Sequence, residues 1–144
     1  MCLLLSCGAA FFPVQALEMH GNNLKTVVIA GAGGLVGSRL LELLLADVTV
    51  SRIILLARKQ PEVESKKVEV LLTDFSDLRP LKSKLAEAEI LYCCIGTTMK
   101  TAGSKEAFRA VDYEIPFRLA EMASAAGVKK FIAISSLGAD PHSR

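Results

Sequence analysis

Five short stretches of the sequence are apolar almost throughout and rich in β-branched residues. They lie at 25–31, 52–57, 68–74, 89–96 and 129–136. Such runs predict strands that are buried on both faces, and their alternation with helical segments is typical of a parallel sheet covered by helices on both sides. Right-handed crossovers between the strands then predict an α/β, Rossmann-like, doubly wound fold, of which this chain holds the N-terminal five strands.

Three segments between these strands have helical character. Residues 34–46 carry leucines at helical spacing, and Leu40, Leu41, Leu44 and Leu45 are expected on one face. Residues 61–66 are polar and too short for a well-formed helix.

The other two helical segments contain proline. Residues 76–88 have Pro80 in their first turns and Ser76 as a plausible N-cap. Residues 104–127 form a long segment in which Pro116 marks a kink or a second start, and Gly127 suits a C-cap.

A chain of 144 residues predicts one domain, which we place at residues 23–144. Residues 1–22 are expected to be an apolar tail that is disordered or reflects an upstream start, because Met19 resembles a natural start ahead of the first strand. A signal or an anchor is the alternative. However, no basic residue precedes the apolar run, which also contains Pro13 and is short for a membrane span.

Charge and cysteine content limit the partners. A formal net charge of +2 without a Lys/Arg run gives no reason to expect nucleic acid or a membrane surface as a partner. Cys93 and Cys94 lie within an apolar run and are expected to be buried on opposite faces of a strand. With no C-x-x-C pair and only two histidines, no metal site is expected. This cysteine usage suits a reducing compartment, and we expect a cytoplasmic protein.

The clearest chemical signal is the glycine-rich turn between the first strand and the first helix. It fits G-x-x-G-x-x-G at Gly31, Gly34 and Gly37, whereas G-x-G-x-x-G fails because its third glycine would be Val36. Gly31 would let the chain turn off the strand, Gly34 would let the backbone meet a pyrophosphate, and Gly37 would let the helix pack close to the sheet. A strand-to-helix turn without a ligand is the alternative.

The end of the second strand bears on which dinucleotide is bound. An acidic residue there would bind the ribose 2′-OH of NAD, but the strand ends with Arg58 and Lys59. A guanidinium pairs with a phosphate through two hydrogen bonds, so NADP is expected and NAD is less favoured. A solvated loop charge is the alternative for Arg58.

Further candidate residues follow the third and fourth strands. Asp74 could accept a hydrogen bond from the adenine amino group or cap the next helix. Gly96 and Thr97 lie where the nicotinamide ribose would be in this topology, with turn formation as the alternative. The expected cofactor-binding residues are Gly31, Ala32, Gly33, Gly34, Leu35, Val36, Gly37, Arg58, Lys59, Asp74, Phe75, Gly96, Thr97 and Thr98.

The stretches "AGAGGLVGSRLLELLL" and "CCIGTTMKTAGSKEAFRAVDYEIPFRLAEMASAAGVKKFIAISSLGADPHSR" resemble the atypical short-chain dehydrogenase/reductases. The likeness is greatest to the NAD(P)-binding oxidoreductases related to the Tat-interacting protein, and it covers residues 25–144. It implies that the glycines form the pyrophosphate loop, that Arg58 lies at the 2′-phosphate and Asp74 at the adenine. It also implies that Ser136, with Ser135 next, is the catalytic serine that polarises a substrate carbonyl.

The sequence departs from this family at the proton-transfer tyrosine. Tyr92 and Tyr113 are followed four residues later by Gly96 and Phe117, so no Y-x-x-x-K occurs. By the resemblance, that motif should begin beyond Arg144, and we expect a chain truncated before it. Asp112 stands where many relatives carry asparagine, and a helix-surface carboxylate is favoured over a role in proton relay.

The sequence thus predicts an oxidoreductase lineage that transfers hydride to or from a carbonyl or alcohol carbon, inactive as this chain. A non-catalytic NADP(H)-binding module that senses redox state or docks to a partner is one alternative. A semialdehyde-dehydrogenase-like cofactor domain is another, although its nucleophilic cysteine would have to lie inside a strand. The bare edge of the fifth strand predicts self-association.

Overall fold

The computed structural model describes residues 24–135. Its strands are β1 (Lys25–Ala30), β2 (Val50–Ala57), β3 (Val68–Leu72), β4 (Ile90–Cys93) and β5 (Lys130–Ala133). Its α-helices are α1 (Leu35–Ala46), α2 (Lys82–Leu85), α3 (Met99–Ala102), α4 (Lys105–Arg109) and α5 (Ile115–Ala126). A 3-10 turn (Arg79–Leu81) precedes α2, and a π-helical segment (Ala110–Glu114) joins α4 to α5.

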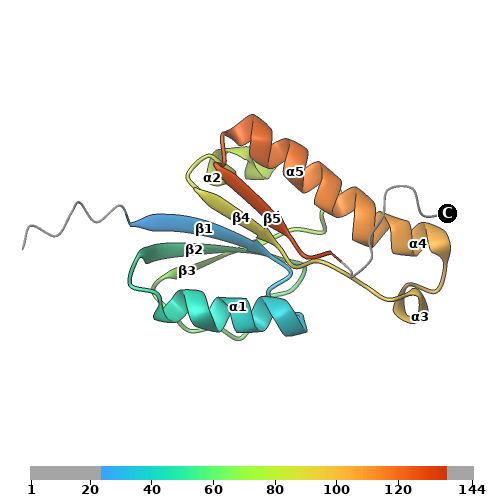
Figure 1. Ribbon diagram of the computed structural model, residues 1–144, viewed down its shortest axis with the longest axis horizontal. Coiled ribbons are helices and arrows are strands. Elements are labelled where there is room, and N and C mark those ends of the chain that lie inside the picture. Colours follow the sequence, from blue (N-terminus) through green and yellow to red (C-terminus); the bar gives the residue numbers. More distant parts are fainter. Residues whose placement is uncertain (1–23, 136–144) are drawn as a thin grey trace, which may run out of the picture.

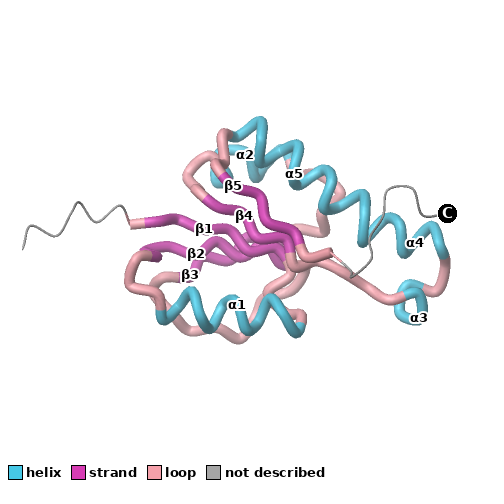
Figure 2. Tube along the Cα trace, in the orientation of Figure 1, coloured by secondary structure: helices cyan, strands magenta, loops and turns pink. Residues whose placement is uncertain are grey.

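The five strands form one parallel sheet in the order β3-β2-β1-β4-β5. Figure 1 shows α1 below the sheet and α2 and α5 above it, so the sheet is the middle of three layers. All strands run the same way, and the loops that follow them gather at one end of the sheet, on the right in Figure 2. We call this end the carboxyl rim and the opposite end the amino rim. The predicted α/β doubly wound fold is confirmed.

The central strands β1 and β2 are mostly apolar because both faces of the sheet are covered there, whereas β5 at the edge is largely exposed, contrary to the prediction. Val27 and Ile29 of β1 belong to the cluster packed against α1, whereas Val28 and Ala30 belong to the cluster under α2 and α5. The neighbouring strand β2 alternates in the same way. Successive side chains of a strand point to opposite faces, so no position in these strands could remain polar without reaching solvent or a partner.

The leucines of α1 lie as predicted. Leu41 and Leu44 are buried, and Leu40 and Leu45 pack against the same cluster. Residues 61–66 contain no helix, again as predicted. The strands end one to three residues earlier than predicted, at Ala30, Leu72, Cys93 and Ala133. The amides of Thr73, Cys94 and Ile134 still bond to the neighbouring strand before the chain enters the loops of the carboxyl rim.

The predicted helix at 76–88 is much shorter than expected. It comprises only the 3-10 turn at Arg79–Leu81 and the single turn of α2. Ser76 does not cap it, because the residue before the 3-10 turn is Leu78 and Ser76 lies in the preceding loop, where it contacts Asp74. Pro80 lies at the start of the 3-10 turn, where its missing N–H costs nothing.

The segment 104–127 is helical as predicted but interrupted at 110–114. Pro116 has no N–H to donate to the carbonyl of Asp112, and its ring would collide with that carbonyl in a regular α-helix. The π-helical segment lies at this position and accommodates the proline. Gly127 ends α5 with φ +82°, the left-handed conformation expected of a C-cap glycine.

The tail at residues 1–22 lies outside the described residues, so its assignment stays a prediction. Within residues 24–135, none of the helices combines the length and the apolar character needed to cross a membrane.

Candidate dinucleotide-binding site

The turn after β1 is shaped by contacts that only glycine permits. Gly31 has φ +88°, and a Cβ there would lie 2.7 Å from the carbonyl carbon and oxygen of Cys94 and 2.8 Å from the nitrogen of Ile95. The turn is therefore pressed against the segment that follows β4. Gly31 is required both for its backbone conformation and for this close approach.

Gly37 has a similar constraint, but the neighbour differs from the prediction. A Cβ at Gly37 would lie 2.2 Å from the carbonyl oxygen of Gly31 and 2.9 Å from the Cα of Ala32. The glycine therefore allows α1 to sit against the turn that leaves β1, rather than against a strand of the sheet. The spacing of the motif sets this contact, since Gly37 is in the first turn of the helix.

The start of α1 presents main-chain donors that the described part of the protein does not use. The amide of Gly34 donates to the carbonyl of Gly31 at 3.2 Å, and the amide of Ser38 donates to Gly34 at 2.9 Å. The three amides between them, those of Leu35, Val36 and Gly37, have no acceptor among residues 24–135. Free N–H groups at the positive end of a helix dipole favour an anion.

The space in front of these amides is open. A Cβ at Gly33 would meet no atom within 4 Å, and one at Gly34 would meet only the carbonyl oxygen of Gly31, at 3.5 Å. The side chains of Leu35 and Val36 are 92% and 55% exposed. Ala32, in contrast, is buried against α1, so only its backbone could reach a ligand.

The end of β2 carries two exposed cations. Arg58 and Lys59 directly follow Ala57, and neither forms an ion pair or a side-chain hydrogen bond with any residue in 24–135. They lie on the carboxyl rim beside the glycine turn, because β1 and β2 are adjacent in the sheet. The rim therefore has two positive charges in addition to the main-chain donors.

The end of β3 is a tight loop held by Asp74. Its Oδ1 accepts hydrogen bonds from the amide of Ser76 at 2.8 Å and from the Ser76 hydroxyl at 2.6 Å. The hydroxyl bond first, and then the amide bond, lower the pKa of Asp74. Of the two alternatives left open, helix capping is wrong, since Asp74 caps a loop turn ahead of the 3-10 turn.

Phe75 within this loop has a strained backbone. Its φ is +65°, a region that bulky side chains rarely adopt, and its ring is buried in the core under α2 and α5. The Phe75 amide donates to the hydroxyl of Thr73 at 3.0 Å, which helps to hold the turn. Phe75 was expected to contact the cofactor, but a buried ring leaves only its backbone available for this.

The loop after β4 is anchored by a residue that sequence reasoning assigned to the helix surface. The Thr97 amide donates to Oδ2 of Asp112 at 2.9 Å, and Asp112 is half-buried. The surface-carboxylate interpretation of Asp112 was therefore wrong. Thr98 caps α3, its hydroxyl accepting from the amide of Thr101 at 3.2 Å.

The end of β5 bears on the serine prediction. Ser135 follows the strand and is exposed, whereas Ser136 lies outside the described residues. The catalytic role of either serine thus stays a prediction. Register places Ala133 beside Cys93, and Cys93 beside Ala30, so Ser135 lies on the same rim as the glycine turn.

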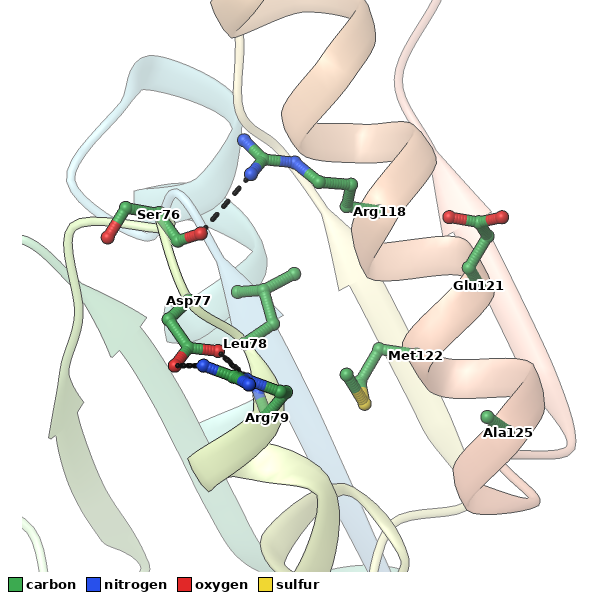
Figure 3. A pocket seen from close by; sticks show the side chains of 8 residues that line it. All are labelled: Ser76, Asp77, Leu78, Arg79, Arg118, Glu121, Met122 and Ala125. Atoms are coloured by element: carbon green, nitrogen blue, oxygen red, sulfur yellow. Dashed lines mark hydrogen bonds and ion pairs between the residues drawn. The ribbon is translucent and has the colours of Figure 1, made fainter.

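A groove of about 480 Å³ lies next to this rim, between the loop after β3 and α5 (Figure 3). Leu78, Met122 and Ala125 supply its apolar lining. Arg118 reaches across it to the carbonyl oxygen of Ser76 at 3.3 Å, and Arg79 is paired with Asp77. No residue of the glycine turn lines the groove, so the groove and the free amides of α1 are separate features.

The two described cysteines have the character of core residues. Cys93 is buried and Cys94 is half-buried, and burial raises the pKa of both thiols. A raised pKa lowers the thiolate fraction at neutral pH and hence the nucleophilicity. Among the described residues, no three His, Cys, Asp or Glu side chains are grouped so that they could hold a metal ion.

Comparison with known proteins identifies the family of the chain. Residues 31–144 match the model of a family described as NAD(P)H-binding. The chain belongs to the NAD(P)H-binding family. The match begins at the first glycine of the turn, the residue that brings the turn against the segment after β4.

Curated relatives agree with the predicted resemblance. The chain is 35% identical over 133 residues to the mitochondrial protein FMP52 of Coccidioides immitis, covering 84% of this chain and 54% of that protein. It is 34% identical over 122 residues to the protein HTATIP2 of Rattus norvegicus, covering 83% and 50%. The resemblance to the atypical short-chain dehydrogenase/reductases is confirmed, and the chain spans about half the length of these relatives.

Solved structures share the fold at lower identity. Uronate dehydrogenase from Agrobacterium tumefaciens superposes with a TM-score of 0.65 at 19% identity, over 78% of this chain and 41% of its own. The ADP-L-glycero-D-manno-heptose-6-epimerase of Helicobacter pylori superposes with a TM-score of 0.68 at 23% identity, over 85% and 42%. These likenesses establish a Rossmann-type fold.

The comparisons overturn one expectation. We expected a cytoplasmic protein from cysteine usage, but relatives from several fungi are named as mitochondrial proteins. Reduced cysteines were a poor guide, since they distinguish oxidising from reducing compartments and not one reducing compartment from another.

Proposed function

We propose that this chain is the NADP(H)-binding part of an oxidoreductase of the short-chain dehydrogenase/reductase type. The observation that carries the proposal is the set of three unpartnered amides at the start of α1, in open space beside a glycine turn. They suit the pyrophosphate of a dinucleotide, with Gly33 and Gly34 leaving room for it. Leu35, Val36 and Gly37 would donate the hydrogen bonds.

The remaining rim residues would hold the two nucleosides. Arg58, with Lys59 beside it, suits the 2′-phosphate of NADP, because a guanidinium offers paired donors to phosphate oxygens. Asp74 has a second carboxylate oxygen for the adenine amino group, since Oδ1 is used by Ser76. The Gly96–Thr97–Thr98 loop would line the ribose of the nicotinamide half. When bound, the nicotinamide supplies the hydride chemistry.

The test is titration calorimetry of the 144-residue chain with NADPH and with NADH. We expect NADPH to bind at least tenfold more tightly, as a charge-assisted contact to one phosphate would provide. Equal affinity for the two would contradict the assignment of Arg58 and leave a general dinucleotide site. No binding of either cofactor to folded protein would contradict the function itself.

The reaction we propose for the family's full-length members is hydride transfer to or from a carbonyl or alcohol carbon, with Ser136 or Ser135 polarising the carbonyl. In this chain the proton would lack its usual donor, because neither Tyr92 nor Tyr113 is followed by a lysine four residues later. General acid/base help is worth about 10²–10⁴-fold in rate, so we expect little turnover. An NADPH oxidation assay with a panel of aldehydes checks this, and turnover above about 1 per second would contradict it.

A non-catalytic NADP(H)-binding module is the second candidate, because the features described on the carboxyl rim suit cofactor binding without requiring a reaction. It predicts that cofactor binding is retained with no turnover for any carbonyl tested, and that a bound partner changes cofactor affinity. The semialdehyde-dehydrogenase alternative is disfavoured, because the raised pKa values of the Cys93 and Cys94 thiols are the opposite of what a nucleophile needs.

Two further properties complete the proposal. We place the folded domain at residues 23–144 and the protein in mitochondria, as the printed names of its relatives suggest. Import of the full chain into isolated mitochondria tests the second point, and persistence of the chain outside them contradicts it.

Self-association through the outer edge of β5 is also proposed. The amides of Lys130 and Ile134 face β4, so those of Phe131 and Ala133 face outwards, where Ile132 and Ile134 are 46% and 48% exposed. Unpaired strand edges of this kind pair with one another. Light scattering should detect dimers or larger species, and a monomer at high concentration would overturn this point.

A further inference from the structure

The carboxylate of Asp112 contacts the loop after β4, although Asp112 is fifteen residues away in sequence from Thr97, its partner in that loop. We propose that Asp112 is a positioning residue that fixes this loop in the conformation that receives the nicotinamide half of the dinucleotide. The proposal rests on the proposed function and adds a residue that supports the binding surface without touching the ligand.

One hydrogen bond ties Asp112 to the loop, since its Oδ2 accepts the Thr97 amide at 2.9 Å. Its Oδ1 lies close to Gly96, 3.6 Å from where a Cβ of that residue would be. The carboxylate therefore lies directly against two consecutive residues of the loop. A hydrogen bond to an ionised group is stronger than one between neutral groups, so one side chain can hold a segment that has no strand partner.

The position of Asp112 follows from the proline four residues later. Pro116 prevents a regular α-helical bond to the Asp112 carbonyl, and Asp112 lies in the middle of the π-helical segment. Such a bulge re-aims side chains relative to a regular helix and is frequent at functional sites. The local sequence thus sets the helix geometry from which Asp112 reaches the loop.

The loop that Asp112 holds is in contact with the glycine turn. The segment Cys94–Ile95 lies against Gly31, and the next two residues are Gly96 and Thr97. A change in the loop would consequently alter the wall of the site on the β4 side. The side of the site near Arg58 would be unchanged, because Arg58 follows β2, which lies on the other side of β1 from β4.

This arrangement predicts a selective defect. Replacing Asp112 with Ala releases the Thr97 amide, and we expect NADPH to bind about tenfold more weakly or worse, the loss typical of a charge-assisted hydrogen bond. Adenosine 2′,5′-bisphosphate has no nicotinamide half. Its Kd for Asp112→Ala should be within about twofold of its Kd for the unchanged protein. Asp112→Asn keeps an oxygen that can accept from Thr97 and should restore most of the NADPH affinity.

The measurements are calorimetric titrations of both ligands with the unchanged chain, Asp112→Ala, Asp112→Asn and the control Glu121→Gln, which removes an exposed carboxylate on α5. An equal loss for both ligands in Asp112→Ala would overturn the proposal in favour of a merely structural role. Unchanged NADPH affinity in Asp112→Ala would overturn it as well. A failure of the unchanged chain to bind NADPH would instead count against the proposed function.

A second readout covers the case in which Asp112→Ala does not fold. Amide hydrogen exchange of the Asp112→Asn variant and of the unchanged chain follows the Thr97 amide directly. We expect protection at Thr97 in both. Rapid exchange at Thr97 in the unchanged chain would show that the carboxylate does not hold the loop, and would overturn the proposal whatever the affinity for cofactor.

Discussion

The two rims of the sheet use charge in opposite ways. At the amino rim, several charged side chains are paired with one another. Arg52 of β2 contacts both Glu69 of β3 and Glu87, and Lys84 of α2 contacts Glu69 at 2.9 Å. Lys129 is paired with Glu89 at 3.3 Å.

At the carboxyl rim, the donors beside the glycine turn are left without partners in the described part of the chain. The amides of Leu35, Val36 and Gly37 have no acceptor there, and Arg58 and Lys59 have no anion. The carboxylates of this rim bind within the protein: Asp74 binds Ser76 in its own loop, and Asp112, from the helical segment 110–114, binds Thr97.

We infer from this difference that the amino rim serves stability and the carboxyl rim serves binding. Paired charges satisfy each other and gain nothing from a ligand, whereas unpaired donors beside open space gain most from an anion. A mutation at the amino rim should therefore change the free energy of unfolding and spare cofactor affinity. A mutation at the carboxyl rim can change affinity alone.

The largest effect is expected at Gly31. In Gly31→Ala, the new methyl group would meet Cys94 at 2.7 Å while the backbone keeps φ at +88°. We expect the free energy of unfolding to fall by about 2–4 kcal/mol and NADPH binding to be lost. Urea denaturation and calorimetry measure the two.

Gly33→Ala is the matched control, because no atom lies within 4 Å of its Cβ position. Its free energy of unfolding should change by less than about 0.5 kcal/mol. Equal destabilisation by the two alanines would contradict the contact between the glycine turn and the segment after β4.

The next effect separates the two dinucleotides. We expect Arg58→Ala to raise the Kd for NADPH by about 10–100-fold, through the loss of a charge-assisted phosphate contact, and to leave the Kd for NADH within about twofold. Lys82→Ala, which removes an exposed cation from α2, should leave both values unchanged. A parallel loss for NADPH and NADH in Arg58→Ala would place the arginine elsewhere than at the 2′-phosphate.

A smaller effect is expected at the amino rim. Arg52→Met removes both of its ion pairs and leaves Glu69 with Lys84 alone. Because these side chains are about one-third exposed, we expect a loss of only about 1–2 kcal/mol in the free energy of unfolding. The Kd for NADPH should not change. A higher Kd, measured under conditions in which the variant is fully folded, would contradict the distinction between the rims.

The smallest effect depends on pH. Hydrogen bonds from Arg52 and then Lys84 hold the pKa of Glu69 below its ordinary value. A lowered folded-state pKa gives stability above the unfolded value of about 4.3 that is lost as the pH falls through the folded value. The difference in unfolding free energy between the unchanged chain and Glu69→Gln should thus be positive at pH 7 and shrink below about pH 4. A constant difference from pH 7 to pH 3 would contradict it.

Much of the fold could be predicted because the strands need no polar face. Continuous apolar runs in β1 and β2 indicate burial on both sides, and the leucine spacing of α1 gives its buried face. The strand ends were predicted less well, because the amides of Thr73 and Cys94 still bond to the neighbouring strand although the regular strand has ended. The helix at 76–88 was overestimated because Asp74 and Asp77 use local hydrogen bonds that compete with helix formation.

The candidate site could be predicted where the expected role of a residue follows from its backbone or from its residue type alone. The glycine spacing and the cations after β2 belong to this class. The role of Asp112 could not be predicted, because it depends on a bulge caused by Pro116 and on a partner at Thr97 that is distant in sequence. Pro116 was the available signal, since a proline within a helical segment changes which side chains face the neighbouring loop.

The most direct test of the account is calorimetric titration of NADPH into the unchanged chain and into Gly34→Ala. A Cβ at Gly34 would lie 3.5 Å from the nearest atom, the carbonyl oxygen of Gly31, so the variant should fold normally. If main-chain amides at the start of α1 hold the pyrophosphate, the unchanged chain binds NADPH and Gly34→Ala binds it at least about tenfold more weakly. Identical binding by the two proteins, or no heat from either at millimolar cofactor, would contradict the account.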